Sequence, residues 1–516
     1  MSIDVDIVAT ATDRPPVFDD RALLGHPRGL GLLFATEMWE RFSFYGMRAI
    51  LVLYLVNELK WDVPRATSLY GTYNMLVYFT PLIGGYLADR VIGTRRSLVI
   101  GGIIIALGHF SLAFPGMPMF YLGLTLIIIG TGFFKPNVST MVGQIYREGD
   151  ARRDAGFTVF YMGINTGAFL GPIVCGWFAQ TRGFGWHWGF AAAGVGMVLG
   201  LLVYVGFRDT YLPGIGINLE PKGAKAGGPG AAAIAADRRA RYQGIGGAIA
   251  GAAGAWLTVG PGVLSIGIGA VVGAALAITI LGTHGEERKR VIALFIVFFF
   301  TIFFWAAYEQ AGSSLTLFAD RHTNLVVGPV HVRSSWFQSV NPFVIIVFAP
   351  VFAWLWVRLG ERAKEPSTAV KMVLGLFLLG VGYLFMVVGG AHADAGVLVS
   401  PLWLVGAYTF HTFGELCLSP VGLSYVTKVA PARFGSLLMG AWFTATAIAE
   451  KVAGWFAGFT PTPGEKITPA TGFAAFIQHV SATNAGFFTI FVVSSIAASL
   501  LMLAFVPLLK RLTKGV

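Results

Sequence analysis

Long apolar segments separated by short polar connections run through most of this chain. Because a helix needs about 20 apolar residues to cross a bilayer, the pattern predicts about fourteen membrane-spanning helices. They are expected at 30–57, 67–88, 97–114, 119–145, 154–180, 188–207, 243–258, 262–282, 289–318, 334–357, 368–390, 400–427, 434–458 and 482–508. Six of them precede, and six follow, a pair of spans rich in Gly, Ala, Val and Ile.

This six-plus-two-plus-six order predicts an all-α polytopic membrane protein with two six-helix bundles and an inserted two-helix hairpin. Transporters that rock two halves about a central site are built in this way. Gly267, Gly269 and Gly273 in the hairpin follow no strand, so they predict close helix packing rather than a phosphate-binding loop. The expected parts are an N-terminal tail (1–29), a first bundle (30–210), a polar linker (211–242), the inserted hairpin (243–285), a second bundle (286–509) and a C-terminal tail (510–516).

The composition excludes a soluble protein. Of the 516 residues, 55% are hydrophobic and 12% are charged, which is the profile of a multi-pass protein in a lipid bilayer. The net charge of +11 comes from Lys and Arg residues that gather in alternate loops. This bias predicts cytoplasmic loops and two cytoplasmic termini rather than binding to nucleic acid. The first twenty residues have no apolar core, so no cleavable signal peptide is expected.

Familiar catalytic and metal-binding motifs are missing from the sequence. Cys175 and Cys417 lie in separate apolar segments without metal-ligand spacing, so we expect them to be packing residues. The sequence contains no His-Glu-x-x-His and no Gly-x-Ser-x-Gly. These observations argue against a membrane-embedded hydrolase, and we expect neither an enzymatic activity nor a cofactor.

Four charged residues, Glu37, Glu40, Arg41 and Arg48, lie within the first predicted span and share one helix face with Tyr45. A charged side chain at mid-bilayer costs roughly 2.5 to 3.5 kcal/mol on insertion scales, so such residues usually face a water-filled path or a bundle interior. We expect this face to line a transport pathway. The alternative is a salt-bridge cluster that only holds helices together, and both roles can coexist when protonation opens the cluster.

Charged side chains also interrupt later spans. Lys135 precedes Pro136 in an apolar span, where a kink is expected. The lysine needs an anion nearby, and the two glutamates of the first span are the expected partners. In the second half, Glu415 is isolated in an apolar helix, and Glu309 follows an aromatic run. Opposite charges on the two bundles suit a zwitterion, because a ligand that contacts both halves favours closure.

Several motifs resemble those of known transporters. The connection after the second span carries four charged residues, Asp89, Arg90, Arg95 and Arg96. It resembles the helix 2–3 signature of the major facilitator superfamily, in which such residues latch helix ends. Together with the charge cluster of the first span, three further stretches resemble the proton-coupled oligopeptide transporter family: Gly130–Ser139, Phe160–Gly167 and Gly414–Gly422.

The resemblance implies roles for single residues. It implies that proton coupling uses Glu37, Glu40, Arg41, Lys135 and Glu309. It implies that Arg48 and Lys135 receive the peptide carboxyl end and that Glu415 contacts the amino end. Further peptide contacts are implied at Tyr45, Tyr78, Asn165, Trp305, Asn341 and Trp442. Gating or structural roles are implied for Asp89, Arg90, Arg95, Arg96 and Pro136. Packing is the alternative for the aromatic residues, and a helix kink is the alternative for Asn341 beside Pro342.

The expected function is proton-driven import of di- and tripeptides by alternating access, carried out by a monomer. Transport of nitrate, another small anion or drugs by the same fold is an alternative, and so is a non-transporting peptide sensor. Glu415 argues against an anion, since it would repel one. Gly71 stands where animal members of the family carry a histidine, so carboxylates must bind the proton. The short connection at 391–400 and the inserted hairpin suggest a bacterial protein of the cell (inner) membrane.

Overall fold

Helices make up nearly all of the described chain. The computed structural model describes residues 17–147, 149–217, 238–259, 263–431, 434–462 and 469–514. Most of the predicted linker and of the N-terminal tail lies outside these residues. Two short strands, β1 (Val326–Val327) and β2 (Val330–His331), form an antiparallel pair in which Val326 lies opposite His331.

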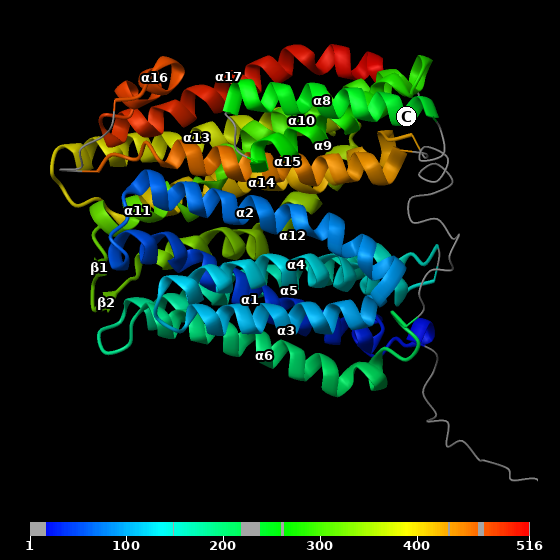
Figure 1. Ribbon diagram of the computed structural model, residues 1–516, viewed down its shortest axis with the longest axis horizontal. Coiled ribbons are helices and arrows are strands. Elements are labelled where there is room, and N and C mark those ends of the chain that lie inside the picture. The colour runs from blue at the N-terminus through cyan, green and yellow to red at the C-terminus, as the bar shows by residue number, and fades with distance from the viewer. Residues whose placement is uncertain are drawn as a thin grey trace, which may run out of the picture.

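The first six long helices form one bundle, in which α1 packs on α5 and α6 while α4 packs on α2 and α3 (Figure 1). Asp62 starts the second helix, because its carboxylate accepts a hydrogen bond from the Arg65 backbone N–H at 2.7 Å. The elements are a 3-10 turn (Val17–Asp19), α1 (Arg28–Leu53) with a π-helical extension (Tyr54–Glu58), α2 (Val63–Leu87) with a similar extension (Ala88–Ile92), α3 (Thr94–Leu112), α4 (Met117–Gln144), α5 (Arg152–Gln180) and α6 (Trp186–Tyr211).

The second bundle follows an inserted helix pair, α8 (Arg238–Val259) and α9 (Val263–Leu281), of which α9 contacts α10 and α15. Its elements are α10 (Gly285–Tyr308), a 3-10 turn η4 (Glu309–Gly312), α11 (Ser314–His322), a 3-10 helix η5 (Ser334–Ser339), α12 (Val340–Glu361), α13 (Thr368–Asp394), α14 (Pro401–Val429), α15 (Gly435–Ala457), the short α16 (Gly472–Val480) and α17 (Asn484–Leu512). The predicted fold, two six-helix bundles with an inserted hairpin, is confirmed.

Nine helical segments of the described chain are long and apolar enough to cross a membrane by length and composition. The first helix, α1, is equally long, but four charged residues in its middle lower its hydropathy. It nevertheless lies inside the first bundle, where most of its residues are buried. Buried charge in a helix that other helices surround is the arrangement expected for a transport pathway.

The predicted span 289–318 is not one continuous helix. It breaks after Tyr308 into the 3-10 turn η4, which begins with Glu309. A side chain at Gly312 in this turn would overlap the hydroxyl group of Tyr70 from α2, so the close approach of another helix requires glycine there. Short 3-10 segments inside long helices often mark functional sites.

The two ends of the molecule differ. We call them the terminus end, where the described chain starts and finishes, and the strand end, where β1 and β2 lie (Figure 1). At the strand end the bundles touch closely, since a Cβ atom on Gly71 would lie 2.9 Å from the Gly454 Cα atom. Hydrogen bonds join the bundles there: Lys451 Nζ to Thr72 Oγ1 at 2.7 Å, Trp336 Nε1 to the Ile173 carbonyl at 3.0 Å and Gln180 Nε2 to Ser334 Oγ at 2.7 Å.

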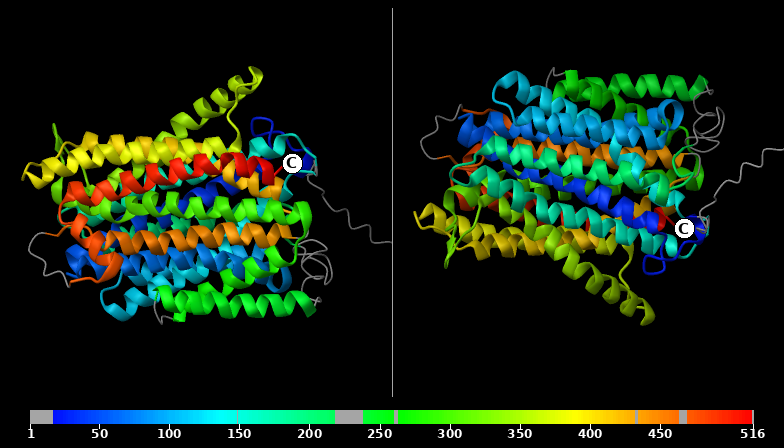
Figure 2. Two further views of the ribbon diagram at one scale, coloured as in Figure 1. Left: turned by 90° about the horizontal axis from the view of Figure 1, so that it is seen from above. Right: turned by 90° about the horizontal axis from the view of Figure 1, so that it is seen from below.

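Toward the terminus end, α12 leans away from its neighbours (Figure 2). Its outer part is strongly exposed, with Trp354 and Val357 each 64% accessible. Pro350 lies inside this helix and removes one backbone donor, which permits a bend. We infer that the structure is the state in which the bundles are closed at the strand end and separate toward the terminus end.

Candidate functional site

A cavity of about 110 Å³ lies between the two bundles near the middle of the helices. Residues from α1, α2 and α5 line one side, and residues from α10, η4, α12 and α14 line the other. Seven side chains that the sequence singled out line it: Tyr45, Arg48, Tyr78, Trp305, Glu309, Asn341 and Glu415. Known ligand pockets measure about 300–1,000 Å³, so this cavity must widen before it holds a peptide.

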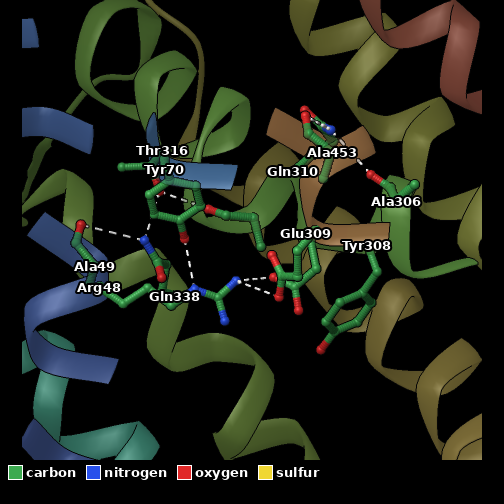
Figure 3. Close-up of polar contacts among 12 residues, drawn as sticks. Arg48, Ala49, Tyr70, Ala306, Tyr308, Glu309, Gln310, Thr316, Gln338 and Ala453 are labelled. Carbon is green, nitrogen blue, oxygen red and sulfur yellow. Dashed lines mark hydrogen bonds and ion pairs between the residues drawn. The ribbon is translucent and has the colours of Figure 1, made fainter. Parts of the chain in front are cut away.

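Arg48 supplies the positive charge in this cavity. It is 5% exposed and forms an ion pair with Glu309, which bridges the two bundles. Its Nε atom also donates a hydrogen bond to the Tyr70 hydroxyl at 2.7 Å (Figure 3). The break at η4 places Glu309 within reach of α1. Because neither charge has much water around it, the pair holds the bundles together as long as both partners are ionised.

Glu415 supplies negative charge on the opposite side of the cavity. It accepts hydrogen bonds from the Tyr308 hydroxyl at 2.6 Å and from Asn341 Nδ2 at 2.8 Å, both at Oε2. Among the described residues no cation lies within 4.0 Å of this carboxylate, although it is only 8% exposed. Neutral donors orient the group, while its charge remains available for a cationic ligand.

Arg41 organises a second charge cluster, one turn and more from the cavity residues of α1. Its guanidinium pairs with Glu40 through two contacts, one of them 2.6 Å long, and its Nε lies 3.2 Å from Glu37 Oε1. All three side chains are at most 4% exposed. The second oxygen of Glu37, Oε2, has no hydrogen-bond partner in the described part of the chain.

The predicted ion pair between Lys135 and the glutamates of α1 is wrong for this structure. Among the described residues, no carboxylate oxygen lies within 4.0 Å of Lys135 Nζ. Arg41 takes both glutamates because it lies on the same helix. Lys135 instead lies 4.5 Å from the centre of the Tyr78 ring, a cation–π contact beside the cavity.

Two other predicted peptide contacts, Asn165 and Trp442, do not line this cavity. The Asn165 amide donates to the Tyr161 carbonyl of its own helix at 2.9 Å. Trp442 is 4% exposed and packs against Phe298, with ring centres 5.9 Å apart. The structure therefore gives both residues packing roles, which the many aromatic residues of the sequence had left as the alternative.

Comparison with known proteins identifies the family. The model of the POT family matches residues 95–213 and 264–473. The Yersinia enterocolitica protein named Peptide transporter YePEPT is 37% identical over 473 residues, which cover 87% of this chain and 90% of that protein. The chain belongs to the POT family.

Further relatives of this POT-family chain match it over similar lengths. The Bacillus subtilis protein named Uncharacterized transporter YclF is 40% identical over 513 residues, covering 96% of this chain and 97% of that one. The Di-/tripeptide transporter of Lactococcus lactis subsp. cremoris is 38% identical over 451 residues, covering 84% and 89%. A crystal structure of peptide transporter POT in complex with sulfate has a TM-score of 0.77 and 39% identity, covering 96% and 97%. The expected family and the expectation of a transporter are confirmed.

The loop signature of this POT-family transporter joins helices of the first bundle. Arg95 Nη1 lies 2.8 Å from Asp209 Oδ1, and its Nε donates to the Ile215 carbonyl at 3.2 Å, so α3 is latched to the chain after α6. Arg90 lies 5.5 Å from the Tyr86 ring centre, and Arg96 is exposed. Pro136 lies inside α4, and the Asn137 amide donates to the Phe133 carbonyl at 2.6 Å beside it. Asp89 lies in the π-helical turn that extends α2.

Sequence reasoning missed several polar residues of this POT-family site. Tyr308 orients Glu415, Tyr70 contacts Arg48, and Gln338 lines the cavity. Gln338 precedes the predicted Asn341 by three residues, so the polar spacing on one helix face was a usable signal. Glu450 is 1% exposed and lies near Arg48, which its position beside Lys451 in an apolar span did not reveal.

Proposed function

We propose that this POT-family protein imports di- and tripeptides together with protons, by alternating access of a site between its two bundles. One observation carries the proposal: a buried cation from α1, Arg48, and a buried carboxylate from α14, Glu415, face one cavity from opposite bundles. A short peptide is a zwitterion whose two ends match these two charges. Ligand contacts to both halves favour closure around the peptide.

Arg48 and Lys135 are proposed to bind the peptide carboxylate, and Glu415 is proposed to bind the ammonium group. The single hydrogen-bonded oxygen of Glu415 supports this, because Oε1 accepts no hydrogen bond from any described residue. Trp305 Nε1, in the cavity wall, likewise lacks a partner among the described residues. It can donate to a peptide carbonyl. Tyr45, Tyr78 and Asn341 complete the proposed wall.

Proton coupling is proposed to work through Arg48. While Glu309 is ionised, it holds Arg48 and the cavity stays small. A proton on Glu309 removes that attraction and releases the guanidinium for the peptide carboxylate. Glu37 and Glu40 are proposed to take up protons in the same way, in exchange for Arg41, with Lys135 as the cation that then pairs with the freed charge.

The available driving force is adequate. One proton moving through 100 mV supplies about 2.3 kcal/mol, and one pH unit adds about 1.4 kcal/mol. One proton per neutral substrate therefore supports accumulation of roughly a few hundredfold.

The protein is proposed to lie in the cell inner membrane as a monomer with both termini in the cytoplasm. The Lys and Arg residues of the loops support this orientation. The terminus end would then face the cytoplasm, and the structure would be inward-facing. The predicted domain boundaries, including the inserted hairpin at 243–285, remain part of this proposal.

Transport of nitrate or another anion by the same fold is less well supported, since Glu415 would repel an anion in the cavity. Relatives that carry drugs and relatives that only sense peptides share the fold. The buried Arg48–Glu309 pair favours coupling over sensing, because an ion pair that protonation breaks is a switch between two states.

The test is uptake of labelled dialanine into proteoliposomes that contain the purified protein, with an inward proton gradient and an inside-negative potential. We expect accumulation that collapses when a protonophore is added. Liposomes without protein and the same liposomes without a gradient serve as controls. Folded protein that neither accumulates nor exchanges dialanine would refute the proposal, and nitrate uptake by the same vesicles would favour the alternative.

A further inference from the structure

Glu450 on α15 is a buried carboxylate to which the transport mechanism above gives no role. Its side chain is 1% exposed, and neither carboxylate oxygen has a hydrogen-bond partner in the described part of the chain. Its Oε1 atom lies 3.9 Å from Arg48 Nη2. Nearly all buried polar groups in native structures are hydrogen-bonded, so an unpartnered carboxylate here requires an explanation.

Glu450 shares its cation with another carboxylate. Arg48 forms its short ion pair with Glu309 and receives Glu450 only at the longer distance. From α2, the Tyr70 hydroxyl accepts a hydrogen bond from Arg48, and Tyr73 is buried on the same side. One guanidinium therefore serves two carboxylates from the second bundle, and only one of them is in direct contact with it.

No other cation compensates Glu450 directly. Its neighbour Lys451 points away, because Lys451 Nζ donates to Thr72 Oγ1 at 2.7 Å and approaches Ser68 Oγ at 3.3 Å. Lys135 on α4 acts on Glu450 only through longer-range electrostatics, since among the described residues it is not within 4.0 Å of a carboxylate. An ionised Glu450 would be a poorly compensated charge inside the membrane, which is costly.

The charges between the bundles do not balance. Five carboxylates face three cations, a net charge of −2 when all are ionised: Glu37, Glu40, Glu309, Glu415 and Glu450 against Arg41, Arg48 and Lys135. A zwitterionic peptide adds no net charge. Its carboxylate does, however, become the third anion that competes for Arg48. Protons on both Glu309 and Glu450 remove that competition.

We propose that Glu450 is a second proton-binding residue of the transport cycle, acting with Glu309 on the same arginine. The inference rests on the proposed function. A proton from water adds to a carboxylate oxygen of Glu450 as Arg48 turns to the peptide carboxylate. The proton returns to water when the peptide leaves and Arg48 again lies between Glu309 and Glu450. At least two protons then accompany each peptide.

The test measures the number of protons per peptide. Proteoliposomes with a fixed dialanine gradient are clamped at a series of membrane potentials, and the potential of zero net flux gives the ratio. The wild-type protein is expected to give two or more. Glu450→Gln is expected to lower the ratio by one and to flatten the pH dependence of uptake. Glu450→Asp keeps a titratable group and is expected to restore most of the wild-type ratio.

Thr446→Val, one turn earlier on the same helix, is the matched control and should keep the wild-type ratio. A wild-type ratio of one overturns the inference, even when Glu450→Gln does not fold. So does a Glu450→Gln protein with the wild-type ratio and pH profile. Absence of dialanine flux in the wild-type protein would instead overturn the proposed function, so the two failures can be told apart.

Discussion

Glu415→Gln isolates the charge proposed to bind the peptide ammonium group. Gln keeps the shape of the side chain and one carbonyl oxygen, so the Tyr308 hydroxyl at 2.6 Å and Asn341 Nδ2 at 2.8 Å retain an acceptor. Since both bonds fall on Oε2, the change chiefly removes the negative charge at Oε1. We therefore expect a folded protein with a weakened amino-end site.

The size of the effect follows from the burial of this carboxylate. Glu415 is 8% exposed, so a bound ammonium group would be largely shielded from water. Hydrogen bonds to charged groups contribute a net 1.5–3 kcal/mol, with about 1.4 kcal/mol for each factor of ten. The KM for dialanine is expected to rise roughly 10- to 150-fold.

The assay is a cycle of two proteins and two peptides in counterflow, which needs no net proton movement. N-acetyl-dialanine lacks the ammonium group, so the wild-type protein is expected to bind it about as weakly as the Glu415→Gln protein binds dialanine. Acetylation should cost the variant little, because the partner charge is already gone. Glu361→Gln, an exposed carboxylate on α12, makes the same chemical change outside the cavity and is the control.

A Glu415→Gln protein whose KM for dialanine stays within about twofold of the wild-type value would remove Glu415 from the amino-end site. Additive effects of acetylation and substitution would do the same, because independent sites give additive free energies.

Three further outcomes are expected. Arg48→Gln should lose uptake and melt at a lower temperature in detergent than the wild-type protein, because removing one partner of a buried pair costs about 3–5 kcal/mol; an unchanged melting temperature would contradict this. Gly71→Val should reduce uptake at least about tenfold and lengthen distances between spin labels placed on the two bundles at the strand end, because its Cβ would lie 2.8 Å from the Glu450 carbonyl oxygen. Hydrogen bonds from Arg152 lower the pKa of Asp150 to about 2, so this pair stabilises the fold above the ordinary pKa and is lost only as the pH falls through about 2. Asp150→Asn should therefore leave the pH profile of uptake between about pH 5 and pH 8 unchanged.

The positions of the spans could be predicted because the length of an apolar segment is a local property. The predicted spans 368–390 and 400–427 correspond to α13 and α14 with small shifts at their ends. The break at Glu309 could not be predicted, because it depends on Tyr70, which approaches from another helix. No local breaker other than Gly312 announces it.

The charges of the site could be predicted as a set but not as pairs. Membrane-embedded Arg48, Lys135 and Glu415 stand out in an apolar sequence whatever their partners. Which carboxylate each cation contacts depends on distances between helices, and on this point the expected partner of Lys135 was wrong. Asn165 and Trp442 were named for the same site, yet their helices turn them into contacts outside the cavity.

The sequence by itself determined the helical membrane fold, the order of its spans and the family, because apolar length and local motifs do not depend on the rest of the molecule. The tertiary structure alone decided how the charges combine. It joined Arg48 to Glu309 across the bundles, gave Glu415 neutral partners and left Glu450 without a hydrogen bond. The physical reason is that in a medium with little water the energy of a charge depends on the few groups within reach, and helices distant in sequence supply those groups.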